Sequence, residues 1–288
     1  MSNSKYASGA AGVRRWGVCL AVSSTFLGIA GLSGESAKAA LPVAILAAGS
    51  PAQAGFGTIK GRLIWGGAGV PQTRVLQDVG KAPKDPEVCA KDKPILSGEL
   101  VVDPKTKGIQ NGFAFLVKPG GANPEAVAGL VKKAVNVVID QKNCEFVPYS
   151  TAIHQDQVLK FTSSDPVNHN VHTASFQNLG INQMVPPGGA LDQKFVAERR
   201  PIPLTCDIHP WMKGFIMVFD HPFFAVTGAD GSFEIQGVPA GAQNFVLWQE
   251  TVGYVTPGLL RGMPVKVGAG QVTDVGDIKL VPKSAATQ

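Results

Sequence analysis

Two short stretches of the sequence concentrate side chains that can bind metal ions. The stretch at 168–172 reads NHNVH and offers two imidazoles, and the stretch at 206–212 reads CDIHPWM and offers a thiol, an imidazole and a thioether. A short loop can hold the three donors of the second stretch together, and a histidine from the distant first stretch can complete the set. The predicted metal ligands are His169, Cys206, His209 and Met212.

The donor types in this set favour copper. Thiolate and thioether are soft ligands, imidazole is borderline, and two histidines, one cysteine and a weak axial methionine form the ligand set of blue copper sites. Zinc does not normally recruit a thioether, and calcium or magnesium requires oxygen ligands. We therefore predict one mononuclear type 1 copper ion as cofactor, with Cys206 as its thiolate ligand and Met212 as its axial ligand.

Other residues compete for these positions. His172 is an alternative to His169 as the first imidazole ligand, and water or a carbonyl oxygen could replace Met212. His154 and His221 stand apart from both stretches, so we expect them on the surface or in structural roles.

The rest of the chain reads as strands and turns. Glycine (34) and proline (21) fall at short intervals, which is typical of many short strands joined by turns. Asn123 and Pro124 favour one short helix that continues to residue 133. The predicted class is therefore all-β, with strands at 57–65, 100–103, 113–117, 135–140, 144–148, 158–161, 194–197, 214–219, 223–227, 232–236, 244–249, 265–267 and 272–280.

The motif C-x-x-H-x-x-M, preceded by H-N-V-H, resembles the cupredoxins, most of all those of the amicyanin and plastocyanin type. Cupredoxins place Cys, His and Met in the loop before the last strand, a position that residues 214–219 match. The resemblance covers residues 135–220 and implies a Greek-key β-sandwich or barrel. It further implies His169 as first ligand, a partly exposed ring of His209 as the electron port, and an Asn170 hydrogen bond to the ligand loop.

The flanking sequence resembles a second family. GTIKGRL at 57–63 and AVTGADGSFEIQGVPAG at 225–241 are similar to strands of carboxypeptidase regulatory-like (transthyretin-like) sandwiches. If both flanks belong to one sandwich, the cupredoxin is an insertion within it. The predicted domains are 1–54, a signal peptide or anchor; 55–133, a β segment with loops; 134–220, the copper domain; 221–282, a regulatory-like β domain; and 283–288, a flexible tail.

The first 54 residues read as an export signal. An Arg-Arg pair precedes an apolar stretch at 16–32, and A-x-A cleavage sites follow at 37–39 and 52–54. The apolar residues 39–48 leave an uncleaved membrane anchor open as an alternative. We therefore expect an exported protein, periplasmic or on the cell surface, that meets the membrane only if this segment is retained.

The cysteines fit an oxidising compartment. Cys19 leaves with the signal, so three cysteines remain for the mature chain. The economical pairing joins Cys89 to Cys144 and keeps Cys206 as a metal thiolate. The alternative is that Cys89 and Cys144 are both reduced and buried.

These features together predict an electron-transfer protein rather than an enzyme. Five histidines are too few for a multicopper enzyme, and the basic residues are scattered, which argues against nucleic acid as a partner. The expected partners are redox proteins, and Trp211 could either form a docking patch for them or shield the copper from water. Alternatives are copper storage or delivery, and a carbohydrate or cell-surface binding module that uses Trp65, Trp248 and Tyr254.

Overall fold

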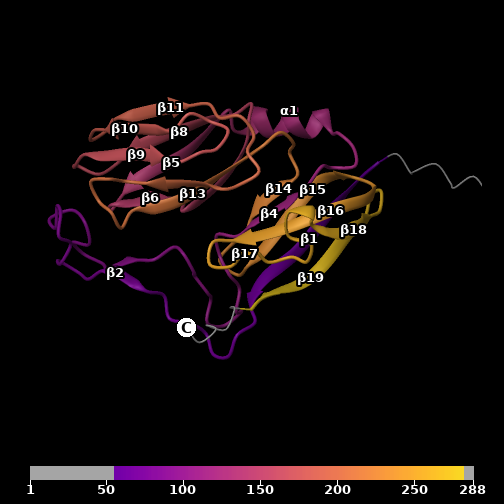
Figure 1. The fold of residues 1–288 in the computed structure, drawn as a ribbon, viewed down its shortest axis with the longest axis horizontal. Coiled ribbons are helices and arrows are strands. Elements are labelled where there is room, and N and C mark those ends of the chain that lie inside the picture. The colour runs from indigo at the N-terminus through magenta and orange to yellow at the C-terminus, as the bar shows by residue number, and fades with distance from the viewer. Residues whose placement is uncertain (1–54, 282–288) are drawn as a thin grey trace, which may run out of the picture. The chain divides into compact units, whose positions relative to one another are not determined.

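The computed structural model describes residues 55–281, and nearly all of its regular elements are strands (Figure 1). The helical elements in this range are α1 (Pro124–Lys133) and the short 3₁₀ helix η1 (Leu259–Arg261). Neither has the length and apolar character that crossing a membrane would require. The predicted all-β class is confirmed.

Two sheets enclose the core that contains the predicted metal ligands. Strand β8 of the four-stranded sheet buries alternate residues along its whole length, whereas β13 of the five-stranded sheet buries residues on both of its faces. The five-stranded sheet has the order β10 (Ile181–Val185), β9 (His169–Thr173), β12 (Ile202–Thr205), β13 (Lys213–Phe219) and β7 (Ser150–His154). The four-stranded sheet has the order β11 (Ala190–Gln193), β8 (Val158–Ser163), β5 (Asn136–Lys142) and β6 (Glu145–Val147).

The segments before and after this central part pair with each other. Strand β1 lies between β15 and β19, and β4 lies between β14 and β16, so both flanks contribute to the same two sheets. Their apolar side chains share a separate core. The strands of these sheets are β1 (Phe56–Trp65), β4 (Phe113–Leu116), β14 (Phe224–Val226), β15 (Ser232–Pro239), β16 (Gly241–Gln249), β17 (Gly253–Tyr254), β18 (Met263–Val267) and β19 (Val272–Leu280). The regulatory-like character of these flanks stays a prediction.

A cluster of aromatic side chains joins the flanking sheets to the central ones. Phe113 and Phe115 of β4 pack in one cluster with Phe215 and Phe219 of β13. The ring centroids of Phe115 and Phe219 are 5.2 Å apart. This packing fixes β13, the strand that follows the predicted ligand loop.

The segment between β1 and β4 is divided between the two cores: residues 76–95 pack against the central core, and residues 100–109 pack against the flanking one. It contains the short strands β2 (Val75–Gln77) and β3 (Ile95–Leu96), and its residues Cys89 and Ile95 are buried in the central core. A disulfide joins Cys89 to Cys144, which confirms the predicted pairing. In Figure 1 this segment carries the β2 label and runs beside the central strands.

The structure corrects two predicted strands. Residues 100–103 make only an isolated bridge between Val102 and Ile109, because the side chain of Asp103 accepts backbone N–H groups and closes a turn at once. Residues 194–197 bond to side chains instead of a strand, since Asn178 binds the backbone of Val196. The other predicted strands are confirmed to within a few residues.

The predicted helix is also confirmed. The side chain of Asn123 accepts a hydrogen bond from the N–H of Ala126, and Pro124 occupies the first turn.

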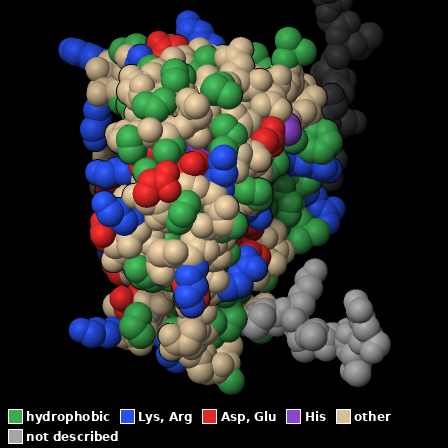
Figure 2. Space-filling view, turned by 90° about the vertical axis from the view of Figure 1, so that its left-hand side faces the viewer, with side chains coloured by type: hydrophobic (Ala, Val, Ile, Leu, Met, Phe, Trp, Pro, Cys, Tyr) green, Lys and Arg blue, Asp and Glu red, His purple; other side chains and the backbone are tan. Residues whose placement is uncertain are grey.

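The predicted export signal (1–54) and the tail (283–288) lie outside the described residues. Figure 2 shows one face of the molecule, on which basic and acidic side chains are interspersed.

Candidate metal centre

The predicted ligands lie at the start of one strand of the five-stranded sheet and in the loop that follows the neighbouring strand. His169 is the first residue of β9, and Cys206, His209 and Met212 form the loop between β12 and β13. Strand β12 pairs with both β9 and β13, which brings the loop beside His169. The N–H of Met212 donates to the carbonyl of His209 over 2.9 Å, so the loop closes in a tight turn.

The structure brings three of the predicted donors to one point. The Nδ1 atom of His169 lies 3.0 Å from Nδ1 of His209, and the latter lies 3.9 Å from Sγ of Cys206. Ligand atoms of these three residues all lie within 4.8 Å of one another. Both histidines are 0% exposed, and the side chain of Met212, at 1%, is buried in the same core as Cys206.

A carboxylate holds the far nitrogen of each ring. Nε2 of His169 lies 2.9 Å from Asp165, and Nε2 of His209 lies 2.9 Å from Asp85. A hydrogen bond at Nε2 fixes the ring orientation and leaves Nδ1 free to bind a metal ion. Asp165 also accepts hydrogen bonds from two backbone N–H groups at residues 143 and 144.

Hydrogen bonding shifts the pKa values of two donors in opposite directions. Burial alone lowers the pKa of His169, but its hydrogen bonds to Asp165 and Cys206 prevail and raise the pKa to about 9. Burial raises the pKa of the Cys206 thiol, but hydrogen bonds with His169 and His209 prevail and lower the pKa to about 6. A thiolate therefore forms here at neutral pH, and thiolate is the metal-binding form of cysteine.

Polar side chains lock the start of the ligand loop onto β9. The side chain of Asn170 accepts a hydrogen bond from the N–H of Asp207 over 2.7 Å, which confirms the predicted bond from Asn170 to this loop. His172, the competitor for the first ligand position, instead places Nδ1 2.8 Å from the carboxylate of Asp207. His172 is not part of the buried donor group.

The exposure expected for His209 is wrong. The resemblance implies a partly exposed ring, yet the ring is 0% exposed. The reason is the segment around Asp85, which covers Nε2 of the ring and lies outside the residues that the resemblance covers. Sequence reasoning also missed Asp165, although its position four residues before His169 was a local signal.

The remaining histidines stand apart from the donor group. His154 is 3% exposed and accepts a hydrogen bond from the N–H of Asp156 through Nδ1. The ring of His221 stacks on Phe223. Both placements agree with the structural roles expected for these residues.

The three aromatic residues suggested for carbohydrate binding differ in exposure: Trp65 is buried, whereas Trp248 and Tyr254 are half-buried. Trp65 is 9% exposed and donates from Nε1 to the carbonyl of Gly69. Trp248 packs against Phe113 and Phe215.

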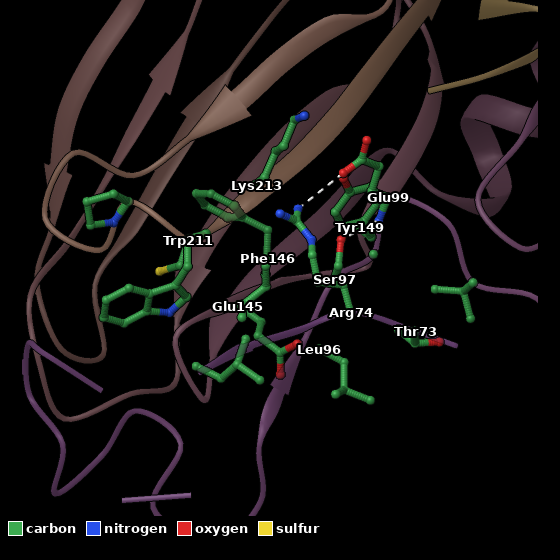
Figure 3. A pocket seen from close by; sticks show the side chains of 16 residues that line it. Thr73, Arg74, Leu96, Ser97, Glu99, Glu145, Phe146, Tyr149, Trp211 and Lys213 are labelled. Carbon is green, nitrogen blue, oxygen red and sulfur yellow. Dashed lines mark hydrogen bonds and ion pairs between the residues drawn. The ribbon is translucent and has the colours of Figure 1, made fainter. Parts of the chain in front are cut away.

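A pocket of about 480 Å³ opens beside the ligand loop (Figure 3). Trp211 and Met212 are among the residues that line it, and so are Arg74 and Glu99, which form an ion pair at 3.3 Å. Trp211 is partly exposed, and its ring centroid lies 5.2 Å from that of His209. The indole thus links the buried ring to an accessible part of the surface.

Comparison with solved structures finds matches to part of the chain. A copper-containing nitrite reductase (NirK) from Thermus scotoductus SA-01 matches at 20% identity and a TM-score of 0.27, over 29% of this chain and 22% of the reductase. A mutant of amicyanin in the Cu(I) form matches at 18% identity and a TM-score of 0.27, over 37% of this chain and 98% of amicyanin. A purple cupredoxin from Nitrosopumilus maritimus matches at 21% identity and a TM-score of 0.25, over 29% of this chain and 98% of that protein.

No known protein family and no curated protein matches the sequence. The structural matches are similarities over a minor part of the chain. Any copper hypothesis therefore depends on the donor geometry itself.

Proposed function

We propose that this protein binds one copper ion as a type 1 centre and transfers single electrons between redox partners. The observation that carries the proposal is the convergence of two Nδ1 atoms and a free, buried cysteine sulfur. Nitrogen ligands about 2.0–2.1 Å from one metal ion can lie at the separation found here. The proposed ligands are His169, Cys206, His209 and Met212.

The donor set fits copper better than zinc, because a buried thioether accompanies the two imidazoles and the thiol. Copper bound here would supply a reversible one-electron change between Cu(I) and Cu(II). The protein would hold the ligands in a fixed geometry and exclude water from them. Carboxylates fix both rings, Cys206 is readily deprotonated, and the apolar core around Met212 keeps water away.

We place the electron port at Trp211 rather than at His209. The ring of His209 is buried, whereas the indole of Trp211 contacts it and lines the open pocket. A redox partner that docks over this pocket would approach the centre through the indole. The indole would then both shield the centre from water and contact the redox partner, so Trp211 would fill both of the roles expected for it.

An exported location and redox-protein partners belong to the same proposal. The Cys89–Cys144 disulfide suits an oxidising compartment such as the periplasm or the cell exterior. The signal-like sequence of the first 54 residues supports this location.

Optical and electron paramagnetic resonance spectra of the copper-loaded protein test the proposal. We expect an intense visible thiolate-to-copper band that is absent from Cys206→Ser. His169→Ala should also abolish it, whereas the matched control His172→Ala should leave it intact, because His172 lies outside the donor group. A wild-type protein without this band, or a band lost only in His172→Ala, would refute the assignment.

A further inference from the structure

The ring of His209 is closed off by a segment from another part of the chain. Asp85 precedes His209 by 124 residues, and its Oδ2 atom lies 2.9 Å from Nε2 of the ring. The ring is 0% exposed, whereas the side chain of Asp85 is 23% exposed. Asp85 therefore lies between the buried imidazole and solvent.

The segment that carries Asp85 is built as a cap; we define the cap as residues 80–90. Its two ends meet where the N–H of Gly80 donates to the carbonyl of Ala90 over 2.8 Å. Inside it, the N–H groups of Val88 and Cys89 both donate to the carbonyl of Asp85. The backbone of Asp85 has φ of +48°, a left-handed conformation that is uncommon outside glycine.

The disulfide attaches this cap directly beside the ring. Sulfur atoms of Cys89 and Cys144 and a ring nitrogen of His209 lie within 4.8 Å of one another. Cys144 precedes β6, so the disulfide connects the cap to the core of the central sheets. Both cysteines are 0% exposed. The disulfide therefore anchors one end of the cap beside His209.

We propose that Asp85 is a positioning residue that sets the tautomer of His209 and lowers the reduction potential of the centre, an inference that rests on the proposed copper site. The carboxylate accepts the proton of Nε2–H, which leaves Nδ1 free as a ligand. Its negative charge, next to the ligand ring and largely shielded from water, favours the oxidised and more positive copper ion over the reduced one.

Substitution of Asp85 by asparagine tests the effect of its charge while the shape of the side chain is kept. Asp85→Asn keeps an acceptor for Nε2–H but removes the charge. We expect the ratio of Cu(II) to Cu(I) affinity to fall about tenfold, which raises the one-electron midpoint potential by about 59 mV. Asp92→Asn is the matched control, because it removes the same charge from an exposed residue just beyond the cap. The control should change the ratio less than twofold, and equal shifts in the two variants would overturn the proposal.

A second measurement needs no copper. Nitrogen-15 NMR of the metal-free wild-type protein should show a proton on Nε2 of His209, held by the Asp85 carboxylate, and Asp85→Ala should leave Nε2 only partly protonated. A wild-type ring protonated on Nδ1 alone would overturn the positioning role, even if Asp85→Asn does not fold. Failure of the copper assignment would appear separately, as a wild-type protein without the thiolate band.

Discussion

The two imidazoles of the candidate centre are supported in different ways. Asp165 holds His169 from only four residues earlier, whereas Asp85 holds His209 across 124 residues. Asp165 also accepts two backbone N–H groups and has a side chain that is 6% exposed, against 23% for Asp85. Asp165 lies in the loop before β9 and binds the turn between β5 and β6, whereas Asp85 depends on the disulfide-bound cap.

This difference predicts that His169 is held more firmly than His209. The His169 side should persist as long as the central sheets are folded. The His209 side should loosen whenever the cap opens, even if the sheets remain intact.

Removal of the disulfide should produce the largest effect. Cys89→Ser combined with Cys144→Ser opens a tether between residues 55 positions apart, and we expect a loss of about 4 kcal/mol in the free energy of unfolding. Urea unfolding of the metal-free protein measures this loss. Hydrogen exchange should then rise in the cap at residues 80–90 while β9 stays protected.

Cys206→Ser serves as the control for that experiment, because it removes a buried sulfur without opening the tether. Its cap should exchange as slowly as that of the wild-type protein. Equal loss of protection in the cap and in β9 would show that the two histidines are not supported independently.

Truncation of the two carboxylates should give unequal losses. Asp165→Ala leaves two backbone N–H groups and a buried imidazole without their acceptor, so we expect a loss of about 3 kcal/mol. Asp85→Ala exposes the ring of His209 to water that can replace the carboxylate, so we expect about 1 kcal/mol. Denaturant unfolding of the two metal-free variants compares them directly, and a larger loss for Asp85→Ala would reverse the comparison.

The thiol of Cys206 should respond more to one histidine than to the other. Among the groups that lower its pKa to about 6, His169 has the larger effect and His209 the smaller. His169→Gln should raise this pKa by about one pH unit, and His209→Gln should raise it less. Thiolate absorbance of the metal-free proteins against pH measures both, and equal or reversed responses would contradict the assignment.

The same pKa values set the direction of the pH dependence of copper binding. Below about pH 6 the Cys206 thiol keeps its proton, and copper must displace this proton to bind the sulfur. The apparent affinity for copper therefore falls as the pH falls. The imidazolium of His169 must also lose its proton, so affinity should keep rising until about pH 9.

Much of the centre could be predicted because its signals are local. The loop that contains Cys206, His209 and Met212 spans seven residues, and the alternation of β1 or β8 is visible in a few residues each. The disulfide followed from cysteine parity. The candidate ligands therefore needed only one long-range assumption, the approach of His169.

The cap could not be predicted because no local pattern marks it. Asp85 lies in a polar stretch with several other charged residues, and its contact with His209 exists only in the folded chain. The strand expected at 194–197 failed for a related reason. Its backbone is satisfied by the side chain of Asn178, a contact that hydrophobic alternation does not encode.

The smallest effect on stability is expected at Trp211, where the cap leaves the centre accessible. Nε1 of this indole is buried and has no hydrogen-bond partner among residues 55–281, so Trp211→Phe removes no hydrogen bond. We expect the free energy of unfolding to change by about 1 kcal/mol or less.

The electron self-exchange rate of the copper-loaded Trp211→Phe protein should nevertheless fall several-fold, because the ring that links His209 to the pocket becomes smaller. The control is Asp85→Ala, which uncovers His209 and should not slow self-exchange. If Trp211→Phe exchanged electrons at the wild-type rate while Asp85→Ala exchanged them faster, the port would lie at His209 beneath the cap and not at the indole.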